Sequence, residues 1–400
     1  MNFRNPKNIL LTGATGVVGA RILCEILAST QANIFCLLRG KEVDRAKERL
    51  AQLVQVYDPN NQLADLFNTR VIPILGDLTK RRFAVENDKY KQLLQQIDQV
   101  FHVAANVSMI ASYNQLAEIN VKGTEEIIDF CLAGQIPLLY TSSYSVMGSK
   151  AFDSGFVFKE NHLEIGQKFE YQDYEKTKWE AEKRIQQAGK RGLRWITVRL
   201  GDVFGDSETG CYPLTQTTNR SIYYEIIKSI TDTGLFFFGC DPLYLTPVNY
   251  VAQASLYLAH HPEAEQKTFH LCNPDFKLMY GFANSLIEFG YKVKILPLEE
   301  YLPLFRANSV EKNGKPYSSS FTNLMLFLEY VIGLEALVSS DPGLKTVEVD
   351  TSKAQQILSP ANIICPPINP ELMSKYLNYC IDNNFIVSPS EQSFATIKKC

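Results

Sequence analysis

The sequence of 400 residues predicts an α/β protein built on a parallel, doubly wound sheet. A glycine-rich turn, Thr12–Gly19, follows the apolar stretch Ile9–Leu11 and precedes a helical pattern over Ala20–Ala28. Strand-like and helix-like stretches then alternate as far as Leu271, an order typical of parallel strands. A content of 46% apolar residues is enough for one large core and a second lobe, which we expect to be smaller, C-terminal and mostly helical.

Each further element is expected from an apolar stretch bounded by turn residues. Helices are expected at Ile119–Leu132 and Tyr174–Ala188. Strands are expected at Asn33–Leu38, Arg70–Asp77, Gln99–Ala105, Pro137–Ser142, Arg194–Leu200 and Thr268–Leu271. From this order we expect residues 1–205 and 245–274 to form the sheet domain, and residues 206–244 and 275–400 to form the second lobe.

The glycine spacing of the first turn is that of a dinucleotide-binding corner, the start of a Rossmann-type fold. Gly13 permits the tight turn, Gly16 lets the backbone approach a pyrophosphate, and Gly19 lets the helix pack closely on the strand. We expect cofactor contacts from Thr12, Gly13, Thr15, Gly16, Val17 and Gly19. The alternative is a glycine-rich turn of some other α/β protein, and a P-loop is excluded because no Gly-Lys-Ser/Thr follows.

The residues after the second strand favour NADP over NAD. An acidic residue there usually binds the ribose hydroxyls of NAD, whereas an arginine can bind the 2′-phosphate of NADP. Arg39 occupies this position and Arg49 follows close behind, and a planar guanidinium suits phosphate oxygens. The alternative is an ordinary solvated basic loop.

Two further strand ends lie on the carboxyl side of the sheet, where such folds bind their ligand. Asp77, with Leu78 beside it, can accept a hydrogen bond from the adenine amine or can simply cap the turn. Ala104 and Ala105 are small enough for the cofactor backbone to pass close by.

Tyr174, Lys178 and Ser143 are the residues that we expect to perform the chemistry. Residues four apart on a helix share one face, so Tyr174 and Lys178 can act together. Hydride delivery to a carbonyl builds negative charge on its oxygen, where a tyrosine hydroxyl can donate. A tyrosine has a pKa of about 10, which a neighbouring ammonium lowers. Lys178 can also hold the nicotinamide ribose, and Ser143 offers a second hydroxyl at its strand end.

In their order along the chain, these motifs resemble the short-chain dehydrogenase/reductases of the extended type. The glycine turn, Asp77, the segment Asn120–Thr124, Ser143 and the Tyr174/Lys178 pair occur in that family's order. The resemblance implies that Ser143, Tyr174 and Lys178 are catalytic. It also implies that Asn120 helps to relay a proton, although an asparagine in a helix can be simply structural.

A finer resemblance is to the thioester reductases, which occur as terminal domains of peptide and polyketide synthases and of carboxylic acid reductases, or as separate chains. The similar stretches are Cys36–Arg39, Gly76–Lys80, Phe101–Val107, Gly205–Gly210, Thr246–Val251, Phe269–Pro274, Cys365–Pro367 and Tyr376–Leu377. The resemblance implies that NADPH reduces an acyl thioester on the phosphopantetheine arm of an acyl or peptidyl carrier protein. The product is then an aldehyde, or an alcohol after a second round. Two departures are Asn249, where we expect Asp, and Tyr144, where a smaller residue is usual.

Other functions share these catalytic residues. A fatty acyl-CoA reductase is the strongest rival, and Leu324–Leu337 can line its acyl tunnel or simply pack in the core. A sugar-nucleotide epimerase or another dehydrogenase keeps the same catalytic set, but the C-terminal motifs do not resemble theirs. A non-catalytic NADP-binding protein is disfavoured, because such proteins often lose the Tyr or the Lys.

Composition argues against several other classes. The net charge is −3 with both signs interspersed, so no nucleic-acid surface is implied. Nine scattered cysteines indicate reduced thiols, and five histidines outside any ligand pattern indicate no metal site. No signal peptide is visible, and two glutamates interrupt Leu324–Val338, so we expect a cytoplasmic protein without a membrane span. Arg306–Ser320 is expected to be a loop, and nothing in the sequence indicates the oligomeric state.

Overall fold

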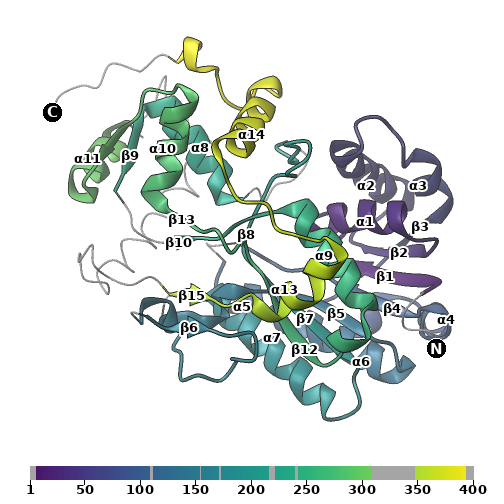
Figure 1. Ribbon diagram of the computed structural model, residues 1–400. Helices are drawn as coiled ribbons and strands as arrows, with labels where there is room; N and C mark the ends of the chain where they lie inside the picture. The colour runs from purple at the N-terminus through teal and green to yellow at the C-terminus, as the bar shows by residue number, and fades with distance from the viewer. Residues whose placement is uncertain are drawn as a thin grey trace.

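The computed structural model describes residues 6–108, 111–153, 155–170, 173–215, 221–238, 242–308 and 347–392. Within these residues the chain forms a seven-stranded parallel sheet between two layers of helices, with a second lobe beside it (Figure 1). The doubly wound α/β fold with a smaller, mostly helical lobe is therefore confirmed.

The candidate site lies where the order of the strands reverses, between the first and fourth strands of the chain. Its strands, in spatial order, are β12 (Lys267–Leu271), β7 (Trp195–Leu200), β5 (Leu138–Ser143), β4 (Gln99–His102), β1 (Asn8–Thr12), β2 (Asn33–Leu38) and β3 (Val71–Leu75). From β1 the chain builds outward to β2 and β3, and then returns to add β4 on the other side. The carboxyl ends of β1 and β4 therefore open the crevice in which such sheets bind ligands.

Helices cover both faces of the sheet, which explains why its strands are almost continuously apolar. On one face the buried core includes residues of α1 (Val17–Ser29), α2 (Val43–Tyr57), α3 (Ala64–Arg70), α9 (Val248–His260) and α13 (Ser352–Leu358). On the other face it includes residues of α4 (Asn87–Gln96), α6 (Thr124–Gly134) and α7 (Asp173–Gly189).

The second lobe is assembled from three separate stretches of chain. Its elements are α8 (Ile222–Thr233), β9 (Leu235–Phe237), α10 (Met279–Phe289), β14 (Lys294–Leu296), α11 (Leu298–Asn308) and α14 (Pro370–Asp382). They surround one hydrophobic core that is rich in Phe and Tyr, and β9 pairs with β14 in parallel. Figure 1 shows this lobe beside the sheet domain, with the end of the described chain at its far side.

Three further pairs of short strands lie outside the seven-stranded sheet in the described residues. β8 (Asp202–Phe204) pairs with β11 (Leu245–Pro247), β10 (Pro242–Leu243) with β13 (Lys277–Leu278), and β6 (Val157–Phe158) with β15 (Glu348–Val349). Short helical turns lie at η1 (Arg81–Ala84), η4 (Pro262–Ala264), η5 (Ser359–Ala361) and η6 (Pro389–Glu391).

Between α11 and α14 of the second lobe, the segment Val347–Cys365 lies against the sheet domain. β15 pairs with β6, and α13 packs against β12 and α9. The division of the chain at residues 205, 245 and 275 remains a prediction, to which the structure adds that Val347–Cys365 lie against the sheet domain. Of the expected loop Arg306–Ser320, only Arg306–Asn308 are described, at the end of α11; the apolar stretch Leu324–Val338 lies outside the described residues.

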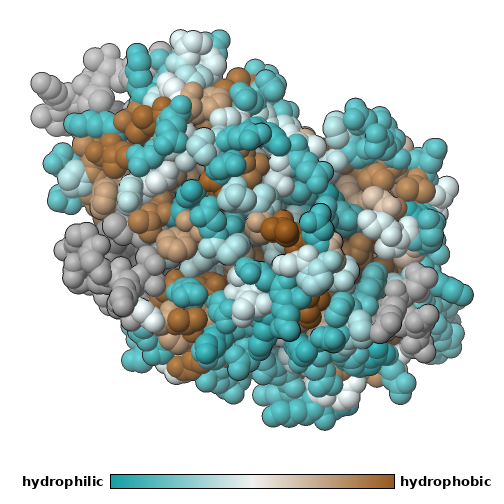
Figure 2. All heavy atoms as spheres, in the orientation of Figure 1, coloured by the Kyte–Doolittle hydropathy of each residue, from teal (hydrophilic) through white to brown (hydrophobic). Residues whose placement is uncertain are grey.

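In the part of the chain that the structure describes, every helix is too short or too polar to cross a bilayer. Figure 2 shows a face that is mostly hydrophilic, with separate hydrophobic areas.

Candidate active site

The turn between β1 and α1 has the shape that a pyrophosphate requires. Gly13 has a φ of 76°, and a Cβ at this position would lie 2.5 Å from the backbone nitrogen of Ala104. A Cβ at Gly19 would overlap the carbonyl oxygen of Gly13. Each of the two positions therefore requires glycine for α1 to start this close to the turn. No side chain caps α1 at Gly16 and no acidic residue lies in its first turn, which leaves the start of the helix suited to an anion.

Arg39, Arg49 and Asp77 meet beyond the ends of β2 and β3. Arg39 and Arg49 are exposed, and Arg49 Nη2 donates to the carbonyl oxygen of Arg39 over 3.0 Å. Asp77 Oδ1 accepts from the backbone nitrogen and the hydroxyl of Thr79, both over 2.9 Å, so it does cap the turn. Partial burial acts to raise the pKa of Asp77, but these bonds and the charges of Lys80 and Arg39 outweigh it and lower the pKa. A negative Asp77 close to Arg39 fits the adenosine end of a dinucleotide, with Leu78 half-buried beside it.

Helix α7 brings the Tyr–Lys pair against the strand that ends in Ser143. Lys178 is only 2% exposed, and its Nζ donates to the carbonyl oxygen of Thr141 over 2.8 Å and to the hydroxyl of Tyr140 over 3.3 Å. Tyr174 lies one turn earlier, close enough for its charge to act on the pKa of Tyr140. The fold thus gathers Tyr174, Lys178 and the end of β5 near the glycine turn.

Burial changes the pKa values of both members of the pair. It lowers the pKa of Lys178 to about 7, against the opposing charge of Glu182. It raises the pKa of Tyr174, to which the charge of Glu175 adds. The direction for Tyr174 is opposite to the lowering expected from the sequence, because desolvation of the phenolate and the charge of Glu175 both raise the pKa. A tyrosine with a raised pKa keeps its proton, which is the form needed to donate one.

Ser143 begins the helical turn η3 (Tyr144–Phe152). Its Oγ accepts from the backbone nitrogen of Ser145 over 3.2 Å and lies 2.8 Å from the Ser145 Oγ. Ser143 pairs with Leu200 across the sheet, so the end of β7 lies beside it.

Asp202, just beyond β7, is a site residue that sequence reasoning missed. It accepts from the hydroxyls of Tyr223 over 2.7 Å and Tyr144 over 3.3 Å, and from the backbone nitrogen of Tyr244 over 2.8 Å. Tyr223 belongs to α8 of the second lobe, so this carboxylate joins the two parts of the molecule next to Ser143. The only signal in the sequence is the position of Asp202 after the end of a strand.

Asn120 lies in a π-helical turn, η2 (Glu118–Gly123), between α5 (Tyr113–Ala117) and α6. Its Oδ1 accepts from the backbone nitrogen of Asn106 over 2.7 Å, and its Nδ2 donates to the Asn106 carbonyl over 2.9 Å and to Thr177 Oγ1 over 3.0 Å. Thr177 in turn donates to the carbonyl of Tyr174 over 2.7 Å. The Asn120 side chain therefore ties the loop after β4 to the first turn of α7, which supports the structural alternative; π turns of this kind often occur at functional sites.

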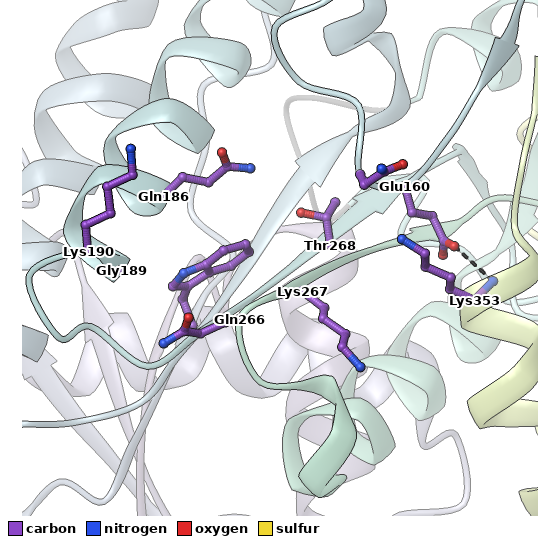
Figure 3. A pocket seen from close by; sticks show the side chains of 10 residues that line it. Glu160, Gln186, Gly189, Lys190, Gln266, Lys267, Thr268 and Lys353 are labelled. Carbon is purple, nitrogen blue, oxygen red and sulfur yellow. Dashed lines mark hydrogen bonds between the residues drawn. The ribbon is translucent and has the colours of Figure 1, made fainter.

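A pocket with a cavity volume of 400 Å³ lies at the other end of the sheet (Figure 3). Trp195 and Thr268, which line it, belong to the amino-terminal ends of β7 and β12. Further lining residues come from α7 and α13, and the lysines of the pocket, Lys190, Lys267 and Lys353, are exposed. Because the candidate site lies at the carboxyl ends of the strands, this pocket has no part in it.

The fold and the site define an NAD(P)-dependent oxidoreductase of the extended short-chain dehydrogenase/reductase type. The family described as "Male sterility protein", an NAD-binding family, matches residues 11–255, and the chain belongs to it.

The chain is similar to reductase domains of large synthases. It is 26% identical over 92% of its length to a linear gramicidin synthase protein of Brevibacillus parabrevis, and 28% identical over 88% to a glycine betaine reductase of Emericella nidulans. It spans 7% and 28% of those proteins, respectively. Among solved structures, the terminal R domain from the myxalamid PKS-NRPS biosynthetic pathway has a TM-score of 0.82 and 28% identity, with 96% of this chain and 93% of that one covered.

Proposed function

We propose that this chain reduces acyl or peptidyl thioesters, carried on the phosphopantetheine arm of a carrier protein, with NADPH as the reductant. The observation that supports this most is the buried Lys178 between Tyr174 and the end of β5, next to a glycine turn that fits a dinucleotide. The similarity to a terminal reductase domain over almost the whole of both chains supports the choice of substrate.

The roles of the side chains follow from their positions. NADPH, when bound, supplies a hydride to the thioester carbon. Tyr174 donates its proton to the oxygen on which charge develops, and the hydroxyl of Ser143 donates a hydrogen bond to the same oxygen. Lys178 holds the nicotinamide ribose and places a positive charge near Tyr174. The hemithioacetal then loses its thiol, which takes up a proton, and an aldehyde is released; a second hydride gives an alcohol.

The cofactor and site residues proposed from the sequence belong to this scheme. The glycine turn holds the pyrophosphate, Arg39 with Arg49 the 2′-phosphate, and Asp77 the adenine. Ala104 and Ala105 leave room for the cofactor backbone. The partner is a carrier protein rather than a nucleic acid, and the reaction takes place in the cytoplasm.

The experiment that tests the proposal is NADPH consumption with acyl-pantetheine and acyl-CoA thioesters of several chain lengths, with products identified by mass spectrometry. Aldehyde or alcohol that appears together with free thiol supports thioester reduction. Turnover of acyl-CoA with no turnover of acyl-pantetheine favours a fatty acyl-CoA reductase instead. Reduction of simple ketones or aldehydes without any thioester turnover contradicts the proposal.

A further inference from the structure

We propose that Tyr140 is the positioning residue of Lys178, through a hydroxyl that holds the lysine Nζ and a ring that lies against it. The inference rests on the proposed function only in the role of Lys178. Tyr140 is on β5, three residues before Ser143, and its side chain is fully buried. The Lys178 Nζ lies 4.7 Å from the centroid of its ring and 3.3 Å from its hydroxyl oxygen.

The hydroxyl of Tyr140 has Thr124 of α6 as a second neighbour, and a side-chain hydrogen bond between the two acts to lower the pKa of Tyr140. Thr124 Oγ1 donates its own hydrogen to the carbonyl oxygen of Asn120 over 2.7 Å. The Tyr140 oxygen accepts from the ammonium of Lys178, which carries only donors.

The same Thr124 hydroxyl connects this contact to the glycine turn. His102 Nε2 lies 3.0 Å from Thr124 Oγ1, and His102 Nδ1 lies 2.7 Å from Thr12 Oγ1. Because Thr124 has already used its hydrogen, His102 donates from Nε2 and accepts at Nδ1 from Thr12. Thr12 also accepts from the backbone nitrogen of Ala104 over 3.3 Å. This buried chain joins Thr12, at the end of β1, to Lys178.

The chain of hydroxyls holds Lys178 in place and does not carry its proton away. One branch ends at the carbonyl of Asn120, which cannot take up and pass on a proton. The other passes through His102, whose pKa is lowered to about 3 by burial and by the charge of Lys178, so the imidazole stays neutral. Positioning is therefore the function that the geometry allows.

Four titratable groups face or act on Lys178. Glu182 follows it by one turn and is paired with Arg199 over 2.8 Å, Tyr174 precedes it by one turn, and His102 and Tyr140 lie on β4 and β5. In the ground state Tyr140 is the one whose oxygen accepts a hydrogen bond from the ammonium. Its loss should destabilise the charged form of Lys178.

The test is Tyr140→Phe, which keeps the ring and removes only the hydroxyl. On the alkaline side, kcat/KM should fall to half its maximum at a pH about one unit lower than in the unaltered chain. At pH 8 this corresponds to about a tenfold lower kcat/KM. The NADPH dissociation constant, measured by fluorescence titration without substrate at several pH values, should show a pH midpoint that is lower by the same amount. Tyr376→Phe is the matched control, because Tyr376 is equally buried in the second lobe and donates to the Gly205 carbonyl over 3.1 Å.

An unmoved midpoint in folded Tyr140→Phe, in both measurements, overturns the proposal. If Tyr140→Phe does not fold, Thr124→Val tests the contact from the other side, since Tyr140 then loses its other hydrogen-bond partner. A midpoint that moves down supports the inference, and one that stays in place refutes it. The binding titration needs no thioester, so a failure of the proposed substrate leaves this result interpretable.

Discussion

The sheet domain and the second lobe are built in different ways. In the sheet domain β1, β2 and β3 lie side by side in the order of the chain, and the core consists mainly of Ile, Leu, Val and Ala. The second lobe draws on stretches as far apart as α8 and α14, and its centre is aromatic. There Tyr224 stacks on both Phe204 and Tyr212, with ring centroids 4.6 and 4.0 Å away. Part of the strand order therefore follows the order of the chain, whereas the lobe depends on contacts between distant stretches.

The two regions also divide the chemistry. The groups proposed to hold NADPH and to donate protons all lie in the sheet domain, and the second lobe reaches them through Tyr223 and its bond to Asp202. Substitutions in the two regions should therefore separate cofactor binding, chemistry and stability.

The largest effect is expected from Tyr174→Phe. Loss of the proton donor should lower kcat by about 10³-fold, since general acids contribute roughly 10²–10⁴. NADPH affinity, measured by fluorescence titration, should change little because the ring is retained. Activity close to that of the unaltered chain would refute the role of Tyr174.

In the second lobe, Phe282→Ala should lower the free energy of unfolding by about 3–5 kcal/mol. Phe282 is fully buried against Phe204, at a centroid distance of 6.2 Å. Both tryptophans, Trp179 and Trp195, lie in the sheet domain, so urea unfolding followed by their fluorescence reports on that domain alone. Circular dichroism reports on both regions, and we expect its transition to move more than the fluorescence transition.

The control for Phe282→Ala is Ile287→Ala on the same helix, α10. Ile287 is 41% exposed, so its loss should change the free energy of unfolding by no more than about 0.5 kcal/mol. If fluorescence and circular dichroism move together in Phe282→Ala, the two regions unfold as one unit.

Arg39→Ala should weaken NADPH binding by about 10- to 100-fold and leave NADH binding nearly unchanged, because only NADPH carries the 2′-phosphate. Arg45→Ala is the matched control, since Arg45 is 82% exposed and already paired with Glu42 over 2.9 Å. Equal weakening of both cofactors by Arg39→Ala would contradict the assignment.

The pH dependence should be the mildest effect. Lys178 has a pKa of about 7 in the fold, below its ordinary 10.5, so kcat/KM should fall above pH 7, to about a tenth at pH 8. Stability moves the other way. Between pH 7 and 10.5 the unfolded chain binds more protons at this lysine, so its contribution to the free energy of unfolding rises with pH. Urea titrations at several pH values give the free energy of unfolding of the unaltered chain and of Lys178→Met. The same slope of that free energy against pH in both proteins would contradict the prediction.

Much of the sheet domain could be predicted from the sequence. β2 has the predicted limits, and α7 differs from its predicted helix by one residue at each end, because apolar stretches and turn residues mark both locally. The π turn at Asn120 leaves no such mark, and the short pairs such as β8 with β11 depend on partners far along the chain.

The same limit applies to the site. The spacing of Tyr174 and Lys178 on a helix, after a dinucleotide-binding corner and a strand that ends near Ser143, predicted these three residues, whose roles remain predictions. Asp202 and Tyr140 gain their importance from contacts across the fold. Sequence reasoning counted the charge of Lys178 beside Tyr174, but the depth at which both groups lie becomes apparent only in three dimensions.

The contacts of β15 and α13 with the sheet domain limit how chimaeras can be made between this chain and its relatives. Glu160 accepts from the backbone nitrogens of Lys353 and Ala354 over 2.9 and 3.0 Å, and His270 Nδ1 lies 2.7 Å from the carbonyl of Asp350. A chimaera with a foreign second lobe must therefore retain Val347–Cys365 of this chain. Without that segment, a buried glutamate and a buried histidine of the host sheet domain lose these partners, and the graft would fail for reasons unrelated to its substrate.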